Sequence, residues 1–493
     1  MDKHTILILD FGGNNQAQSL AKMLRGAGIY TEIMPYNAPI DLINQVNPQG
    51  ILMTGGREPL EQECDYGVWL MRTPVLAIGA SARQMVRQLG GQVKSAQLEE
   101  MMLELTMDDS CPLFDGIPHC ERFVQRINAI DLPENFRAVA KGEGMIAAFA
   151  YDKKRLYGIQ FDIEANDPEG LTVLNNFLND ICCCERWWSI PTFIDATITG
   201  IREQIGSGNA LMALSGGVDS SVCAVLMHHA IGKQLHCIYV DTGLMRKGDT
   251  ETVRRVFLEQ MGVNVIMVDA KARFMAKLAG VTDPKEKWRL VSEEFAAIYE
   301  EEAAKLPSID CLIECTIYND VLHGYEQGNL LPVQDDDLTL TGKPTLEPVR
   351  GLFKEEVRTV GEVMGLPPEI VGRQSFPGAG LGIRIIGEVT EESLRLLREA
   401  DAIWSEELIA ANLDRRVRRY FAVLSETAST GRVHCERIIA LRALGNAGND
   451  YTAYRMPYDL LERVTERILR ELPKIDRVVY DMTTTPHRPA EWE

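Results

Sequence analysis

The chain has 493 residues, of which 51 are basic and 71 acidic, and its formal net charge is −20. This balance excludes a general binder of nucleic-acid backbones, because such a protein needs a basic surface. Hydrophobic residues make up 45% of the chain and charged residues 25%, as in ordinary globular proteins, and no apolar run approaches the roughly 20 residues of a membrane-spanning helix.

A chain of this length has room for about two to four domains. The first is predicted over residues 1–187 as an α/β unit. Its short apolar runs alternate with helical patterns, which is typical of a mainly parallel, doubly wound sheet covered on both faces. A second group of strands and a closing helix complete it. The expected strands are 5–12, 30–36, 50–56, 74–80, 136–151 and 156–162, and the expected helices are 15–28 and 170–183.

A second doubly wound domain is predicted over residues 188–375. It begins with a helix stopped by Gly-Ser-Gly, after which the order of strand, turn and helix restarts. The charged stretch 335–351 is expected to be an excursion that leads back into this domain. A smaller α+β domain is predicted over 376–493. The second domain's expected segments are a helix at 193–208, a strand, turn and helix at 209–232, and strands within 234–249 and 263–274.

The strongest chemical signal is the sequence Ser-Gly-Gly-Val-Asp-Ser at 215–220, between an apolar strand and a helix. Two glycines let the backbone fold closely around an anion, and the serine hydroxyls and the N–H groups at the helix start then donate to it. Asp219 is a poor direct phosphate ligand, so we expect it to position Mg²⁺ or the loop. The segment is not the Walker pattern, which needs Gly-Lys-Ser/Thr. It resembles the pyrophosphate-binding loop of ATP pyrophosphatases.

Around this loop the resemblance widens to the GMP synthetases. The segments YVDTGLMRKGD, EPVRGLFKEEVR, FPGAGLGIR, RVVYD and EWE resemble blocks of that family, in its order, and the first 185 residues resemble its class I glutamine amidotransferase domain. The resemblance implies an amidotransferase-like domain, an ATP-pyrophosphatase domain and a C-terminal dimerisation domain. It also implies that ATP, with Mg²⁺, adenylates O2 of xanthosine monophosphate (XMP), and that ammonia then displaces AMP to give GMP.

The amidotransferase half departs from that family at its catalytic centre. The strand-to-helix turn PVLAIGASARQM carries the glutamine-attacking cysteine in the family, and here that position is Gly79. Asp162 stands where the resemblance implies the partner histidine, and only the carboxylate, Glu164, remains. A thiolate attacks an amide only when an imidazole takes and returns its proton. Cys64 and Cys111 lie in unrelated segments, so we expect no glutaminase activity.

The adenylating half keeps its main residues. By resemblance, the loop residues hold the β- and γ-phosphates, a second group lines the adenosine, and two basic residues face anionic phosphates, unless those two form a solvated turn. Asp320 assists the metal or the loop, or instead caps a turn. The loop residues are Ser215, Gly216, Gly217, Val218, Asp219, Ser220 and Ser221; the residues that line the adenosine are Val240, Asp241 and Gly243; and the two basic residues are Arg246 and Lys247.

The acceptor side departs more strongly. Arg373, Arg384 and Glu491 match the family, but its lysine before EWE is Thr485 here, and Arg488 is the nearest residue that could supply the charge. The planar guanidinium of Arg488 would supply this charge through a rigid fork of N–H donors, whereas the ammonium group of a lysine acts as a point charge. The family's Gln-Gly before TIY is Glu314-Cys315, and its histidine-containing lid has no counterpart. We therefore expect an altered acceptor.

Three functions remain open at this stage. The first is a GMP-synthetase-like C–N ligase that activates an acceptor oxygen on a purine-like substrate and then uses free ammonia, with sulfur as a further candidate nucleophile. The second is an ammonia-dependent GMP synthase that acts on XMP. The third is a non-catalytic ATP-binding regulatory protein. The resemblance also implies a homodimer formed by the C-terminal domain, and the composition predicts no nucleic-acid or membrane partner.

The chain has 11 cysteines without the pattern of a small secreted scaffold, and its opening apolar run lacks the long core of a signal peptide. We therefore expect reduced thiols and a cytoplasmic protein. The run of three cysteines at 182–184 has no second cluster at zinc-ligand spacing, which favours packing over a metal site.

Overall fold

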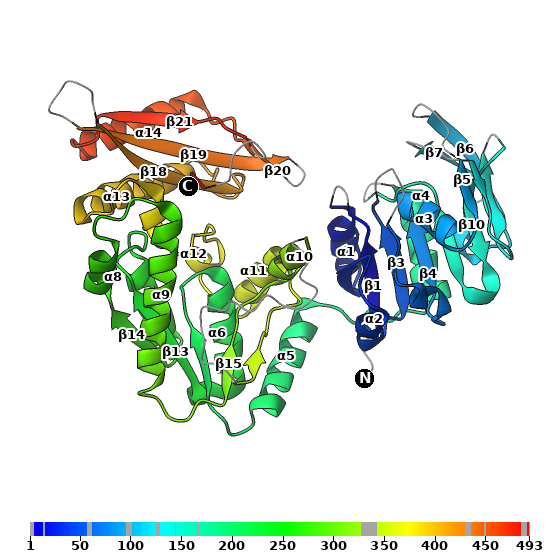
Figure 1. Cartoon of the computed structure of the whole chain (residues 1–493), viewed down its shortest axis with the longest axis horizontal. Coiled ribbons are helices and arrows are strands. Elements are labelled where there is room, and N and C mark those ends of the chain that lie inside the picture. Colours follow the sequence, from blue (N-terminus) through cyan, green and yellow to red (C-terminus); the bar gives the residue numbers. More distant parts are fainter. Residues whose placement is uncertain are drawn as a thin grey trace. The chain divides into compact units, whose positions relative to one another are not determined.

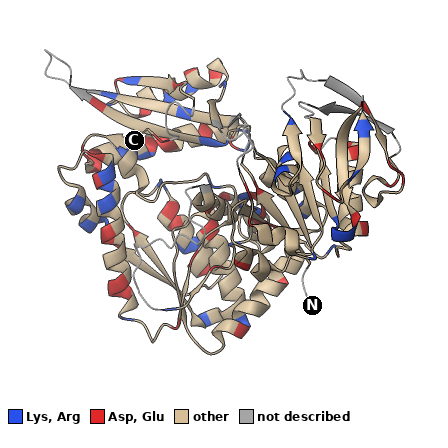
Figure 2. Ribbon diagram, turned by 45° about the vertical axis from the view of Figure 1, so that its right-hand side comes forward, with Lys and Arg blue, Asp and Glu red and all other residues tan. Residues whose placement is uncertain are grey.

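The structure is a computed structural model that describes residues 4–12, 15–56, 62–94, 101–117, 119–124, 129–142, 144–164, 167–326, 343–428, 435–447, 450–484 and 491–492. The chain forms two compact units, Met1–Thr192 with Leu322–Leu331, and Phe193–Val321 with Pro332–Glu493. Acidic and basic residues are interspersed in both units (Figure 2). None of the helices in the described ranges combines the length and the hydropathy that a bilayer span requires.

The first unit contains a nine-stranded sheet in the order β2-β1-β3-β4-β11-β10-β9-β6-β7 (Figure 1). The five strands from β2 to β11 are parallel, as predicted, and the other four continue the sheet in antiparallel pairs. The strands are β1 Thr5–Asp10, β2 Tyr30–Pro35, β3 Gly50–Thr54, β4 Val75–Ile78, β6 Met101–Met107, β7 His119–Val124, β9 Arg137–Gly142, β10 Met145–Tyr151 and β11 Leu156–Ile159, with β5 Gln92–Lys94 paired to β8 Ala129–Asp131.

The helices of this unit follow the strands that they cover. Helix α3 packs its apolar side chains, Ala82, Met85 and Val86, into the core formed by β1, β3 and β4. The predicted closing helix is an α-helix that continues as a π-helical turn. The elements are α1 Gln16–Gly26, α2 Ile40–Val46, η1 Tyr66–Leu70, α3 Ala80–Gln88, η2 Pro112–Phe114, η3 Asp152–Lys154, α4 Pro168–Asn176 and η4 Phe177–Ile181.

The second unit begins with a five-stranded parallel sheet in the order β14-β13-β12-β15-β16. Its strands are β12 Ala210–Ala213, β13 Leu235–Asp241, β14 Val265–Asp269, β15 Cys311–Ile313 and β16 Thr345–Leu346. The helices are α5 Ile190–Ile205, α6 Val218–Ile231, α7 Asp249–Val253, α8 Lys271–Leu278, α9 Pro284–Ala303, α10 Tyr318–Glu326, α11 Lys354–Val363 and α12 Pro368–Val371, with η5 Gly232–Gln234 and the π-helical η6 Arg254–Gln260. The first residues of α5 and the last residues of α10 belong to the first unit. Much of the predicted excursion at 335–351 lies outside the described residues.

The same unit ends with a smaller α+β part, as predicted. In its sheet, β19 pairs with β18 and β20 in antiparallel fashion and with β21 in parallel fashion. The elements are η7 Gly380–Arg384, β17 Ile385–Ile386, α13 Glu391–Ala410, β18 Arg419–Ala428, β19 Cys435–Ala447, β20 Asp450–Ala453, α14 Tyr458–Glu471 and β21 Arg477–Asp481.

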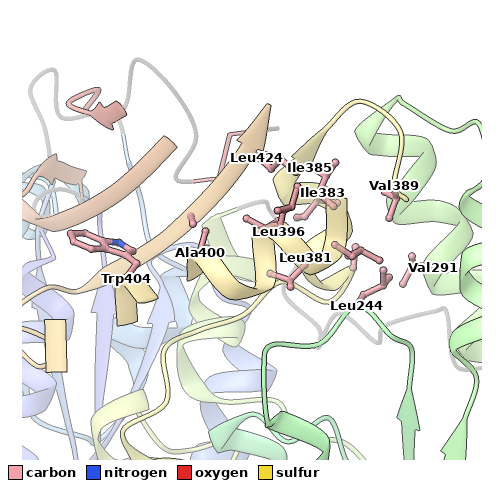
Figure 3. Packing of buried hydrophobic residues seen from close by; sticks show 14 of the residues in the cluster. Leu244, Val291, Leu381, Ile383, Ile385, Val389, Leu396, Ala400, Trp404 and Leu424 are labelled. Carbon is pink, nitrogen blue, oxygen red and sulfur yellow. The ribbon is translucent and has the colours of Figure 1, made fainter. Parts of the chain in front are cut away.

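One hydrophobic core runs through both parts of the second unit. Leu244 follows β13, Leu381 belongs to η7, and Trp404 lies on α13, yet all three belong to one buried cluster (Figure 3). The η7 segment therefore packs against both the parallel-sheet part, through Leu244, and the α+β part, through Trp404. The boundaries predicted at 187/188 and 375/376 stay predictions.

Candidate functional site

The Ser-Gly-Gly loop lies between β12 and the start of α6, as the sequence predicts. Gly216 has φ +76°, and a Cβ there would lie 2.8 Å from Val253 Cγ2 and 3.2 Å from Arg373 Nη1, so only glycine fits. The Ser215 and Ser220 hydroxyls lie 2.9 Å apart, and Ser215 Oγ accepts from the Gly217 N–H at 3.3 Å. This arrangement of hydroxyls at the start of a helix agrees with the predicted anion site, which stays a prediction.

Asp219, in the first turn of α6, has one engaged and one free oxygen. Lys354 Nζ donates to its Oδ2 at 2.6 Å. Its Oδ1 is buried and has no hydrogen-bond partner in the described part of the chain, and the same holds for the fully buried Ser221 hydroxyl. A buried carboxylate oxygen without a donor fits a cation. No group of three or more His, Cys, Asp or Glu side chains among the described residues could hold a metal alone, so nucleotide phosphates would supply the remaining ligands.

Lys354 was missed by the sequence analysis. It is the first residue of α11, where a positive charge opposes the helix dipole. That unfavourable position within EPVRGLFKEEVR was the available signal for a functional lysine.

Arg373 binds the loop itself. Its Nη1 donates to the Gly216 carbonyl at 2.6 Å, and its Nη2 lies 3.1 Å from Asp249 Oδ1. The Arg373 carbonyl in turn accepts from Arg358 Nη2 at 2.9 Å. The guanidinium therefore fixes the backbone shape of the phosphate loop, and its predicted role toward substrate stays a prediction.

The predicted adenosine side lies at the end of β13, where Val240 is buried. Asp241 Oδ1 accepts from the Gly243 N–H at 3.0 Å, and Oδ2 accepts from Thr250 Oγ1 at 3.0 Å. Lys271 Nζ lies 3.1 Å from the same oxygen, and this hydrogen bond raises the pKa of Lys271. From α13, Arg398 donates to the Gly243 carbonyl. The loop after β13 is thus held from three directions.

The two basic residues after this loop have different surroundings. Arg246 Nη2 donates to the carbonyls of Gln374 and Ser375, each at 3.1 Å, and its guanidinium lies 4.4 Å from the Phe376 ring centroid. Lys247 is exposed and pairs with Glu399 at 2.6 Å. The geometry agrees better with the solvated-turn alternative for Lys247 than for Arg246.

Asp320 and the acceptor-side residues are held by neighbours from distant segments. Asp320 Oδ2 accepts from the Ile317 N–H at 3.0 Å at the start of α10, which agrees with a turn role. Arg384, 1% exposed, donates through Nε and Nη2 to the two oxygens of Glu491 at 3.1 and 3.0 Å. Arg419, a residue that the sequence analysis missed, donates to Glu491 Oε1 at 2.7 Å. Thr485 and Arg488 lie outside the described residues.

The acceptor-side pair of arginines keeps free donors. Arg384 Nη1 and Arg419 Nε are buried and have no partner among the described residues. Two guanidinium groups share the single carboxylate of Glu491, which leaves a positive excess. Such a cluster can hold a substrate edge that presents hydrogen-bond acceptors.

The strand-to-helix turn of the first unit, where the resemblance places a nucleophile, has a left-handed glycine at that position. Gly79 has φ +67° and ψ −125°, and its N–H donates to the Ile159 carbonyl at 2.8 Å. A Cβ at this position would lie 2.4 Å from Asp162 Oδ1. The carboxylate of Asp162 therefore lies where the side chain of residue 79 would begin.

The environment of Asp162 suits a carboxyl group that resists ionisation. Although the residue as a whole is exposed, desolvation of its carboxyl group raises its pKa, and the charge of Glu164 adds to this effect. The charge of Arg83 and a hydrogen bond from Gln16 act in the opposite direction without cancelling it. A carboxylate here cannot replace an imidazole as the base that activates a thiol.

The cysteines that could have replaced the missing nucleophile lie in surroundings that disfavour the thiolate. Burial raises the pKa of the Cys64 thiol to about 12, and Cys64 Sγ donates to Gln88 Oε1 at 3.4 Å. Burial also raises the pKa of Cys111, which precedes η2. A raised pKa disfavours the thiolate, which is the form that amide attack requires.

Comparison with known proteins gives matches over the whole chain. Residues 7–181 match the class-I glutamine amidotransferase family, 193–297 match NAD synthase, and 406–492 match the GMP synthase C terminal domain. Glutamine-hydrolyzing GMP synthases of Acetivibrio thermocellus and Caldicellulosiruptor saccharolyticus are 42% and 41% identical to this chain, and each alignment covers 100% of both sequences.

Proposed function

The chain belongs to the GMP synthase family, and we propose that it is an ATP-dependent ligase that lacks glutaminase activity and takes free ammonia as its nucleophile. In the proposed reaction an acceptor oxygen of a purine nucleotide attacks the α-phosphate of ATP, and pyrophosphate leaves. Ammonia then attacks the acceptor carbon, and AMP leaves with the former acceptor oxygen. XMP is the first acceptor to test, because the full-length relatives are named GMP synthases.

The observation that carries the loss of glutaminase activity is the contact between Gly79 and Asp162. Glycine offers no atom for attack on an amide, and Asp162 Oδ1 occupies the space in which a nucleophilic side chain would start. Each of the two missing groups is required for thiol chemistry, so a change at one position alone does not restore it. The first unit therefore supplies no ammonia in this proposal.

The ligase half of the proposal is supported by the phosphate loop. Ser215, Ser220 and the N–H groups at the start of α6 would bind the departing pyrophosphate, and Lys354 would neutralise part of its charge. Asp219 Oδ1 would hold Mg²⁺, which when bound neutralises phosphate charge and orients the leaving group. The free donors of Arg384 and Arg419 would bind the acceptor. Homodimerisation and a cytoplasmic location are further parts of the proposal.

The test combines the full chain with ATP, Mg²⁺ and XMP, with ammonium or glutamine as the nitrogen source. We expect pyrophosphate and GMP with ammonium, and neither above background with glutamine. Asp219→Asn serves as the inactive control. Release of glutamate from glutamine would overturn the loss of glutaminase activity. Tight ATP binding without pyrophosphate release across a panel of purine nucleotides would overturn the ligase and favour a regulatory ATP-binding protein.

A further inference from the structure

Lys287 lies in the first turn of α9, and the proposed function does not use it. The residue is fully buried, with an exposed fraction of 0%. A lysine is almost never fully buried unless its amine is paired, and the first turn of a helix disfavours a positive charge. A lysine at this position therefore needs specific acceptors.

The acceptors of Lys287 are two peptide groups of the η7–β17 segment, residues 380–386. Its Nζ donates to the Gly382 carbonyl at 3.2 Å and to the Ile385 carbonyl at 2.6 Å. Gly382 lies within η7 and Ile385 begins β17, so the two carbonyls flank Arg384 along the chain. One amine therefore holds the backbone on both sides of the arginine that the proposed function assigns to the acceptor.

Further contacts join α9 and the loop before it to this part of the chain. Val291, one helical turn after Lys287, belongs to the buried cluster that contains Leu381 (Figure 3). The Gly280 N–H, in the loop before the helix, donates to Glu388 Oε1 at 2.8 Å. Apolar packing has no preferred direction, whereas a hydrogen bond does. The two hydrogen bonds of Lys287 therefore set the orientation of peptide groups whose side chains are already packed against α9.

The orientation of this backbone decides where the Arg384 guanidinium lies. Arg384 is bonded to Glu491, and its Cζ lies 4.2 Å from the Phe421 ring centroid. Ile385 also belongs to β17, which pairs with β18, the strand that starts at Arg419. A rotation of the peptide groups around Ile385 would therefore shift Arg384 relative to Glu491 and Arg419, with which it forms the acceptor-side cluster.

We propose that Lys287 is a positioning residue for the acceptor, which holds the η7–β17 segment in the orientation in which the Arg384 guanidinium donates to the bound purine nucleotide. This inference rests on the proposed function, because Arg384 is the group through which Lys287 acts. Since Lys287 is fully buried and its amine is bonded to two carbonyls, it acts without touching the nucleotide.

The test measures binding to the full chain by isothermal titration calorimetry with Mg²⁺. The analogue α,β-methylene-ATP is titrated first and XMP second. Lys287→Met fills a similar space without the amine and should raise the Kd for XMP by about 10-fold or more, the loss that one misplaced charge-assisted hydrogen bond brings. The Kd for the ATP analogue should stay unchanged, because the segment that Lys287 holds is not the phosphate loop. Lys285→Met is the matched control, since Lys285 is exposed on the same helix.

Two further measurements separate positioning from a merely structural role. If Lys287 acts through Arg384, the loss of XMP affinity on Lys287→Met should vanish in an Arg384→Met background. Hydrogen exchange of residues 380–386 without nucleotide, read by mass spectrometry, should become faster in Lys287→Met and stay at the parent rate in Lys285→Met. Where Lys287→Met fails to fold, Lys287→Gln takes its place, because the glutamine amide keeps N–H donors.

Failure of this inference and failure of the proposed function give different results. Unchanged XMP affinity in Lys287→Met, an equal loss of affinity for XMP and for the ATP analogue, or additive losses with Arg384→Met would overturn the role of Lys287 alone. A parent chain that binds ATP but no purine nucleotide acceptor would overturn the acceptor part of the proposed function. Hydrogen exchange then still decides, because an unchanged rate at residues 380–386 would show that Lys287 does not hold the segment.

Discussion

Replacement of Gly79 by alanine should destabilise the first unit, and loss of the Asp162 side chain should relieve part of that cost. An L-residue at φ +67° and ψ −125° adopts a conformation whose cost is of order 1–3 kcal/mol. The new Cβ would also lie 2.4 Å from Asp162 Oδ1, and overpacking of this kind costs about 1–3 kcal/mol. Together these terms give a loss of about 2–6 kcal/mol for Gly79→Ala.

A double-mutant cycle separates the two terms. In an Asp162→Ala background the steric term disappears and the backbone term stays, so the penalty of Gly79→Ala should fall by about 1–3 kcal/mol. Hydrogen exchange of the segment 75–88 in the full chain, read by mass spectrometry, reports the local free energy of opening. Gly116→Ala is the matched control, because Gly116 has φ +78° and nothing within 4 Å of an added Cβ. An equal penalty for Gly79→Ala in both backgrounds would refute the contact as the reason that glycine and aspartate occur together.

Three further changes have expected outcomes. Lys354→Met removes a charge-assisted bond to Asp219, worth about 1.5–3 kcal/mol, so kcat/KM for pyrophosphate release should fall by about 10–150-fold while Lys354→Arg keeps part of it. The folded state raises the pKa of Asp162, so it favours the protonated carboxyl group. This contribution to stability is complete below the unfolded pKa of about 3.9 and is lost as the pH rises through the folded pKa. Asp162→Asn should therefore raise the melting temperature at pH 7 and not at pH 3. Glu491→Gln leaves the buried Arg384 guanidinium without its carboxylate, which should cost about 3–5 kcal/mol in denaturant unfolding and raise the KM for the acceptor.

The elements and the phosphate loop were predictable because their determinants are local. Apolar runs that end in glycine predicted the parallel strands β1, β3 and β4, and the loop at 215–220 was recognisable because strand, glycines and helix follow one another directly. The change at Gly79 could also be read from the sequence. Its physical consequence could not, since the Asp162 carboxylate reaches the turn only through the pairing of β11 with β4.

The partners of the site residues were not predictable for the same reason. Lys354 and Asp219 are 135 positions apart, and Arg419 and Glu491 are 72 apart. No periodicity or spacing links such pairs, because the fold alone decides which charges meet. The family resemblance directed attention to residues near the motifs, and Arg419 lies in a segment that carries no motif.

The Gly79 turn and the phosphate loop differ in how their space and polar atoms are filled, and this difference supports the proposal that the first site is lost and the second is kept. At the Gly79 turn the chain's own Asp162 carboxylate occupies the space that the absent side chain would need. At the phosphate loop, Asp219 Oδ1 and the Ser221 hydroxyl are buried and have no partner among the described residues, although each such atom costs about 1–3 kcal/mol when nothing binds it. In the proposed function, that cost would be relieved when a cation and a polyphosphate bind. This contrast supports the proposal that the loop takes a ligand from outside, whereas the turn is closed by the protein's own Asp162.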